Sequence, residues 1–369
     1  MAKVATQKPA GLFLLEGISF LTFNKDFKKC ALSKNDGNIY IYNVTDIMKP
    51  DGWKLETTLE AHLEYISGLD WNHVSNEILS CSYDKTSFVW QFSGGKWTST
   101  DVVAPSKSEL GYLCCKWSSR GDKFCAGTSD KQLFIGYFNP KTNWWMLMNI
   151  KAHKSSVCCC EIDPTSLFVI SGSTDMRVYV SSCYYPEVDD KKLTNETKPL
   201  AQKFGTIIYE FKTNAWVNSV IWNPSGKLGF ASNQNATIAV YDKAKNEASL
   251  IKCKHSPANL LIPNGDDSFF AVCYDRNIYQ YKLTGGKWEI AKNVTEGDKK
   301  GDGKPAAKAG GVSDAVKKFQ TMGVQKKENL VVSSKQSSNL HGALISSVVI
   351  KGKDMLTTDV AGFIKYWKL

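Results

Sequence analysis

The chain has 369 residues and a formal net charge of +10, a length that allows two or three ordinary domains or one large single-layer architecture. Apolar residues make up 43% of it and charged residues 22%, which fits a folded globular protein and excludes a mainly disordered one. Eleven cysteines, with no CxxC pair among them, favour reduced thiols packed in a core over a zinc site or a disulfide framework. We therefore expect a cytoplasmic protein without a metal site.

The positive charge is concentrated in one part of the chain. Residues 291–335 hold ten Lys against five Asp or Glu, half of the surplus. A nucleic-acid module would spread its basic residues along a folded groove with interleaved aromatics, so this distribution indicates a linker. Near the start, the apolar stretch 12–23 is interrupted by Glu16. We read it as a strand pair, neither a signal peptide nor a membrane span.

An internal repeat organises the chain. In each copy an Asp or Asn at a tight turn is followed by an alternating strand. The copies begin at Asp36, Asp84, Asp130, Asp175, Asn235, Asp275 and Asp359. Successive spacings are 48, 46, 45, 60, 40 and 84 residues, so that five lie near one period and the last spans about two.

Each copy is preceded by two short runs with a period of two, and often followed by another. Four short strands per unit, with Gly, Asn and Asp turns, are typical of a propeller blade. The sequence thus predicts an all-β, seven-bladed β-propeller over residues 1–369. Since the chain ends after the third strand of the last blade, 363–369, we predict that residues 12–16 add its fourth strand and close the ring.

Histidines precede three of the turn aspartates, by 22 residues for His62 and His153 and by 18 for His341. This spacing resembles the WD40 repeat, in which a His, a Ser or Thr, the turn Asp and a Trp form a buried hydrogen-bonded chain. The matching residues are His62, Ser80, Asp84 and Trp90 in blade two, His153, Ser171 and Asp175 in blade four, and His341, Thr357, Asp359 and Trp367 in blade seven. In blade four, Tyr179 or Val180 is expected at the Trp position.

The same residues do not indicate an enzyme. A His, Ser and Asp could form a hydrolase triad, but here they recur with the repeat, where burial would satisfy them. The sequence contains no nucleophile elbow, phosphate-binding glycine loop or HExxH motif. We therefore expect no catalytic residues and no cofactor.

Two insertions interrupt the repeat. Residues 184–203, rich in Pro, Asp and Lys, predict a surface loop in blade four. Residues 293–339, between blades six and seven, predict a flexible insertion with a short amphipathic helix at 313–322. Val312, Val316, Phe319 and Met322 would share its apolar side, and Lys317 and Lys318 the polar side. Such a short helix is marginal alone, so it needs a partner, either its own propeller or a groove on another protein.

The whole chain resembles the WD40 subunit of the actin-related protein 2/3 complex. The stretches that carry the resemblance are 23–29, 69–71, 143–145, 153–157, 172–176, 203–205, 216–220 and, most specifically, 312–322. The Gly- and Lys-rich tether before the helix and the weak blade dipeptides depart from the family pattern.

The resemblance implies a non-catalytic scaffold at the actin cytoskeleton. Its partners would be the actin filament, the actin-related proteins and small subunits of the complex, and the acidic tails of nucleation-promoting factors. On this reading Val316, Phe319 and Met322 fill a groove, Lys317 and Lys318 assist electrostatically, and Trp144 and Trp145 are either blade core or further contacts. Two other classes stay open: a peptide-recognising adaptor such as a ubiquitin-ligase substrate receptor, and a nucleic-acid-binding propeller. For the latter, Phe319 is the only aromatic residue between Trp288 and Phe363 on which bases could stack.

Overall fold

Short antiparallel strands dominate the computed structural model, which describes residues 12–13, 17–60, 62–103, 109–200, 202–296 and 341–369. The strands, blade by blade, are β2 (Phe20–Phe23), β3 (Lys29–Ser33), β4 (Asn38–Asn43) and β5 (Lys54–Glu60); β6 (Ile66–Trp71), β7 (Ile78–Ser82), β8 (Ser87–Ser93) and β9 (Lys96–Val103); β10 (Tyr112–Trp117), β11 (Lys123–Thr128), β12 (Leu133–Asn139) and β13 (Trp144–Ile150); β14 (Val157–Ile162), β15 (Phe168–Ser173), β16 (Arg177–Ser182) and β17 (Ile207–Lys212); β18 (Val217–Trp222), β19 (Leu228–Asn233), β20 (Thr237–Asp242) and β21 (Glu247–Lys252); β22 (Ala258–Pro263), β23 (Ser268–Cys273), β24 (Ile278–Thr284) and β25 (Lys287–Asn293); and β26 (Ile345–Lys351), β27 (Asp354–Asp359), β28 (Phe363–Lys368) and β1 (Leu12–Phe13).

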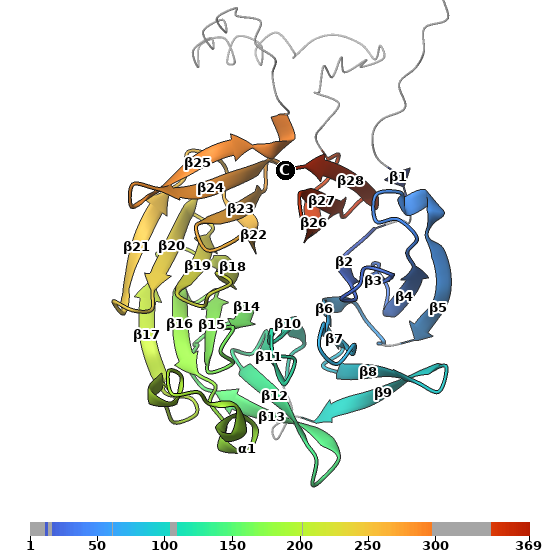
Figure 1. The fold of residues 1–369 in the computed structure, drawn as a ribbon, viewed down its shortest axis with the longest axis horizontal. Coiled ribbons are helices and arrows are strands. Elements are labelled where there is room, and N and C mark those ends of the chain that lie inside the picture. The colour runs from blue at the N-terminus through green and yellow to red at the C-terminus, as the bar shows by residue number, and fades with distance from the viewer. Residues whose placement is uncertain (1–11, 14–16, 61, 104–108, 201, 297–340) are drawn as a thin grey trace, which may run out of the picture.

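The strands form a seven-bladed β-propeller, as predicted (Figure 1). In each blade the first strand lies nearest the central axis and the fourth lies outermost. The last blade has the order β1-β28-β27-β26, in which Leu12 pairs with Ile364 and Phe13 with Phe363. The predicted closure of the ring by the N-terminal strand is therefore confirmed, and residues 14–16 lie outside the described residues.

The repeated turn between the second and third strands of a blade has a local cause. Asp84 Oδ1 accepts a hydrogen bond from the Thr86 backbone N–H at 2.9 Å, and Asp175 Oδ1 accepts one from Arg177 at 3.0 Å. This contact holds the intervening residue in the left-handed region, at φ 72° for Lys85. The side-chain acceptor offsets part of the cost of that conformation, which explains why the turn needs Asp or Asn.

Neighbouring blades are joined by apolar packing and by polar bridges. Phe230 of blade five packs against Phe269 of blade six, with ring centroids 4.8 Å apart. Nearer the axis, Asp70 of blade two accepts a hydrogen bond from the Trp117 backbone N–H at 2.8 Å. Lys116 then forms an ion pair with Glu161 of blade four at 2.9 Å. The inner strands of three consecutive blades are thereby fixed relative to one another.

Blades two and three share one eight-stranded sheet, which the repeat did not predict. Their outer strands β9 and β13 run parallel, with Val102 opposite Trp145 and Val103 opposite Met146. In Figure 1, β9 runs on toward β13 at the outer edge of the ring. This pairing covers the edges of both strands where they meet.

The segment predicted as a surface loop at 184–203 contains α1 (Pro186–Asp189), η2 (Asp190–Lys192) and η3 (Lys198–Leu200). Asp189 is fully buried and forms an ion pair with Lys123 of blade three, which is also fully buried. The Lys123 ammonium further donates to the Ser166 and Cys183 carbonyls at 2.9 and 2.8 Å. The segment is thus fastened beneath blades three and four, a long-range contact that its polar composition did not indicate.

Two further short helices are η1 (Pro50–Gly52) and η4 (Val294–Glu296). No helix within the described residues has the length and apolar character needed to cross a membrane. All eleven cysteines are free, and seven of them are buried.

Candidate functional site

The two ends of the insertion between blades six and seven are fixed to blade turns. On one side, Thr295 is 1% exposed and its hydroxyl donates to Asn277 Oδ1 at 2.8 Å. On the other side, Arg276 Nη1 donates to the Gly342 carbonyl at 3.1 Å. The predicted helix at 313–322, with Val316, Lys317, Lys318, Phe319 and Met322, lies outside the described residues.

His341, just after the insertion, belongs to a buried chain of hydrogen bonds in blade seven. Trp367 Nε1 donates to Thr357 Oγ1 at 2.8 Å, Thr357 Oγ1 lies 2.6 Å from His341 Nε2, and His341 Nδ1 lies 2.8 Å from Asp359 Oδ2. Since an ionised Asp359 can only accept, His341 donates through Nδ1 and accepts from Thr357 through Nε2. Each group then donates to the next, from Trp367 to Thr357, to His341 and to Asp359. Because His341 Nε2 accepts a hydrogen bond, it carries no proton, and the imidazole is neutral.

The environment favours this protonation state. Burial lowers the pKa of His341, and the nearby Asp359 opposes only part of that effect. Burial alone would raise the pKa of Asp359, but hydrogen bonds from His341 and from the Phe363 N–H outweigh it and hold the pKa below its ordinary value. At neutral pH the chain therefore combines a neutral histidine with an ionised aspartate.

Blade two has the same arrangement with one additional member. Trp90 Nε1 donates to Ser80 Oγ at 3.0 Å, and Ser80 Oγ lies 2.9 Å from His62 Nε2. His62 Nδ1 lies 3.3 Å from Asp84 Oδ2 but only 2.7 Å from Thr86 Oγ1. Sequence reasoning missed Thr86. Its position two residues after the turn residue Asp84 could have revealed it.

Blade four brings together His153, Ser171 and Asp175. His153 Nε2 lies 2.9 Å from Ser171 Oγ, and Nδ1 lies 3.1 Å from Asp175 Oδ2. The prediction that Tyr179 or Val180 takes the Trp position was wrong. In blade four, Tyr179 pairs with Ser171, and Ser181 pairs with Val169. In blade two, Trp90 pairs with Ile78, two residues before Ser80. Ser181 therefore has in blade four the position that Trp90 has in blade two. Tyr179 instead packs edge-on against His153, with ring centroids 4.9 Å apart.

Blade six holds a related contact that sequence reasoning missed. His255 Nε2 lies 2.6 Å from the Tyr281 hydroxyl, and its ring stacks on Tyr279 with centroids 4.3 Å apart. His255 precedes the turn residue Asp275 by 20 residues, close to the spacing in the other blades, which could have revealed it.

These buried sets fasten loops between blades to the neighbouring turns. The His62, His153 and His341 side chains are all fully buried, so a substrate could not reach them. Within the described ranges no group of three or more His, Cys, Asp or Glu side chains is placed to hold a metal ion. Their position suits a structural role.

The face that carries these turns also exposes large apolar side chains, and we call it the turn face. They are Leu63, Tyr65, Tyr83, Leu110, Met176, Trp216, Tyr274 and Val360. They lie in loops between blades or in turns between second and third strands, and Leu63 is 95% exposed and Trp216 is 59% exposed. Apolar side chains gathered on one face are typical of protein contacts.

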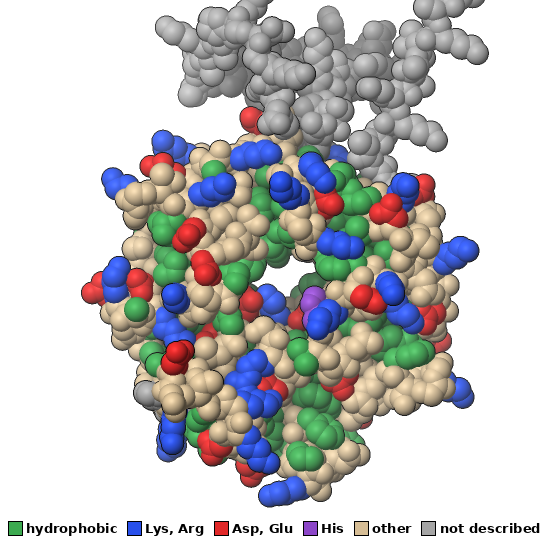
Figure 2. Space-filling model, in the orientation of Figure 1, with side chains coloured by type: hydrophobic (Ala, Val, Ile, Leu, Met, Phe, Trp, Pro, Cys, Tyr) green, Lys and Arg blue, Asp and Glu red, His purple; other side chains and the backbone are tan. Residues whose placement is uncertain are grey.

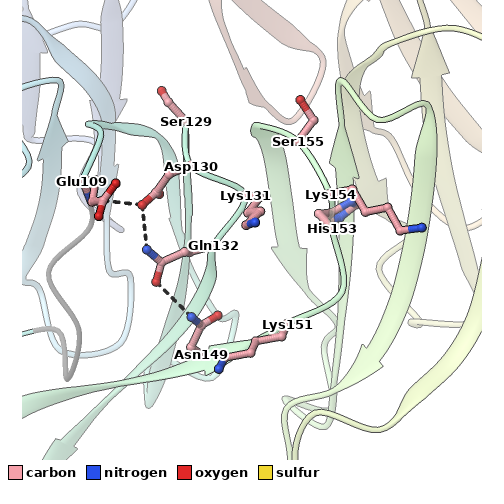
Figure 3. A pocket seen from close by; sticks show the side chains of 10 residues that line it. All are labelled: Glu109, Ser129, Asp130, Lys131, Gln132, Asn149, Lys151, His153, Lys154 and Ser155. Carbon is pink, nitrogen blue, oxygen red and sulfur yellow. Dashed lines mark hydrogen bonds between the residues drawn. The ribbon is translucent and has the colours of Figure 1, made fainter.

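A polar cavity of about 910 Å³ lies on the turn face between blades three and four (Figure 3). On one side, Asp130 accepts from the Glu109 backbone N–H at 3.0 Å and from Gln132 Nε2 at 2.7 Å. Lys131 and Lys151 also line it. Acidic and basic side chains are also mixed over the face shown in Figure 2, around the opening at the centre of the ring.

The two tryptophans at the start of β13 have different environments. Trp145 is 4% exposed and packs between Trp117 and Phe124. Trp144 is 45% exposed. Trp145 is thus blade core, whereas Trp144 is available for a contact.

Comparison with known proteins agrees with this architecture. The family model "WD domain, G-beta repeat" matches residues 53–91 and 144–180. Actin-related protein 2/3 complex subunit 1A-A of Xenopus laevis is 31% identical over 271 residues, which cover 71% of this chain and 70% of that protein. Subunit 1B of Arabidopsis thaliana is 27% identical over 96% of this chain and 94% of its own length. Subunit 1 of Schizosaccharomyces pombe is 24% identical over 68% and 67%. The chain therefore belongs to the family of actin-related protein 2/3 complex subunit 1.

Proposed function

We propose that this chain is a non-catalytic scaffold subunit of the actin-nucleating, branch-forming actin-related protein 2/3 complex. The observation that carries the proposal is the similarity to subunit 1 of that complex, which runs through 96% of the chain in the Arabidopsis thaliana comparison. A closed propeller supports it, because a rigid ring can hold several partners at fixed positions. The protein would act in the cytoplasm, at the actin cytoskeleton.

In this proposal the propeller contacts the actin-related proteins and the small subunits, and the insertion reaches further. Val316, Phe319 and Met322 would fill a groove on actin or help to receive the acidic tail of a nucleation-promoting factor. Lys317 and Lys318 would favour an acidic partner. Two observations support this role: the insertion starts and ends at fixed blade turns, and the same face exposes large apolar side chains.

The test is affinity purification of the tagged full-length chain from native cell extract at two salt concentrations. The proposal expects two actin-related proteins and the other small subunits in constant ratio, retained after nuclease treatment. Recovery of ubiquitin-ligase components in their place would indicate a substrate receptor. Recovery of nucleic acid that is lost steeply with salt would indicate a nucleic-acid-binding propeller. Either result would replace the proposal.

A further inference from the structure

A groove of about 570 Å³ separates the outer edge of blade one from blade two. One wall is the edge strand β5, which within the described residues pairs only with β4. The other wall is aromatic and includes Phe92, which is 43% exposed, and Trp97. One side of the groove therefore offers unpaired backbone groups and the other an apolar surface.

The corresponding place between blades four and five is filled. There Tyr209 of β17 packs against Tyr241, with ring centroids 4.9 Å apart, and its hydroxyl accepts from the Ala248 backbone N–H at 3.1 Å. The cavity that remains is about 10 Å³. Tyr209 pairs with Val180, which lies five residues after the turn residue of blade four. In blade one, Thr57 pairs with Ile41, which likewise lies five residues after the turn residue. Thr57 is therefore the equivalent of Tyr209. A small side chain at position 57 thus leaves the groove open.

On the side away from the groove, blade two pairs with blade three, where the end of β9 lies beside β13. The groove is closed on one side by Lys29, which binds Glu56 at 2.7 Å and lies over the Phe92 ring at 4.8 Å. The groove is therefore a bounded feature between two blades.

Unpaired backbone groups lie along this groove. The edge of β5 that is not paired with β4 presents backbone N–H and C=O groups along its length. A polypeptide backbone in extended conformation supplies both donors and acceptors and would meet the needs of an edge strand.

Charge gives the groove a polarity. Lys54 and Lys96 stand at the start of β5 and β9, whereas Glu60 and Asp101 stand toward the ends of the same strands. All four are exposed and form no ion pair with any described residue. Because the outer strands of successive blades run in the same direction, one end of the groove is basic and the other acidic. An occupant would carry the opposite charges at its two ends.

We propose that the groove between β5 and blade two docks an extended segment of another protein of the complex, which adds a strand to β5. An apolar side chain of the segment would lie against Phe92 and Trp97, with a basic residue near Glu60 and an acidic residue near Lys96. This inference rests on the proposed function, because it takes the occupant from the same assembly.

Hydrogen exchange tests the proposal on the full-length chain, free and in the purified complex. We expect backbone amides of β5 to exchange at least about tenfold more slowly in the complex, with little change in β21, an outer strand of blade five. The variant Thr57→Tyr, which places in blade one the side chain that fills the equivalent site in blade four, should abolish this protection. The variant Glu60→Lys with Lys96→Glu, which reverses the polarity without filling the groove, should weaken it.

Equal exchange of β5 in the free and assembled chain, with the complex intact, would overturn the docking inference alone. A chain that assembles with no partner would overturn both the inference and the proposed function. Protection already present in the free chain, and lost when residues 1–11 are deleted, would assign the groove to this chain's own N-terminal segment and also refute a partner. Retained protection in Thr57→Tyr would exclude this groove as the binding place.

Discussion

Replacing Asp359 by alanine should be the most destabilising single change among the turn aspartates. Its fully buried carboxylate accepts from His341 Nδ1 at 2.8 Å and from the backbone N–H groups of Phe363 at 2.9 Å and Ala361 at 3.1 Å. A buried donor left without an acceptor costs about 1 to 3 kcal/mol. The His341 side chain is fully buried and bears this cost in full, whereas Ala361 and Phe363 are only partly buried residues. We therefore expect unfolding to become easier by roughly 2 to 4 kcal/mol.

Asp84→Ala provides the matched control. In blade two, His62 Nδ1 keeps a second acceptor, Thr86 Oγ1, at 2.7 Å, so we expect a smaller loss of roughly 1 to 2 kcal/mol. Asp175→Ala should fall between the two, since His153 has no such substitute in the structure described. Urea unfolding followed by tryptophan fluorescence would measure all three variants. If Asp359→Ala cost no more than Asp84→Ala, or if all melted like the wild type while assembly failed, the buried-chain reasoning would be refuted.

Three further predictions concern separate parts of the molecule. Asp189→Leu should lower the free energy of unfolding by about 3 to 5 kcal/mol, because it leaves the Lys123 ammonium buried and without its carboxylate. Adding Lys123→Met should restore most of that stability. If the two substitutions destabilised the protein additively in a double-mutant cycle, this prediction would be wrong. Burial lowers the pKa of His62 and of His341 from the ordinary value of 6.5, so on acidification these histidines take up protons in the unfolded chain before they do so in the folded one. Stability should therefore fall as the pH drops below about 6.5. A melting temperature that stays flat or rises from pH 7 to 5 would contradict this prediction. Phe319→Ala should leave the melting temperature and the incorporation into the complex unchanged. It should weaken the contact with a groove on the partner by about 2 kcal/mol, roughly thirtyfold in affinity, and counting of actin branches would detect the loss. A lower melting temperature with normal branching would instead place Phe319 against its own propeller.

The architecture could be predicted because its determinants are local. The turn at Asp84 or Asp175 depends on a hydrogen bond two residues along the chain, and a local contact repeats wherever its residues repeat. The closing pair between Leu12 and Ile364 is distant in sequence. It was nevertheless predictable, because the last repeat lacked a strand and the N-terminal stretch supplied one extra.

What sequence reasoning missed depends on how the repeats are aligned and on long-range packing. The Trp position in blade four falls on Ser181, which lies six residues after Asp175, as Trp90 lies six residues after Asp84. Strand pairing agrees, because Ser181 stands opposite Val169 as Trp90 stands opposite Ile78, so counting from the turn aspartate could have located it. The burial of Asp189 requires Lys123 from another blade, and no local pattern announces such a partner. The parallel pairing of β9 with β13 joins blades two and three into one sheet, whereas no other two blades share a sheet within the described residues.

Branch formation by the assembled complex tests the central claim most directly. Cells depleted of this chain would be supplied with the full-length protein or with an empty vector, the complex would be purified through another subunit, and actin branches would be counted by fluorescence microscopy. The account predicts that the full-length chain is incorporated in constant ratio to the other subunits and restores branching. A complex that assembles and forms branches equally well without the chain would contradict it.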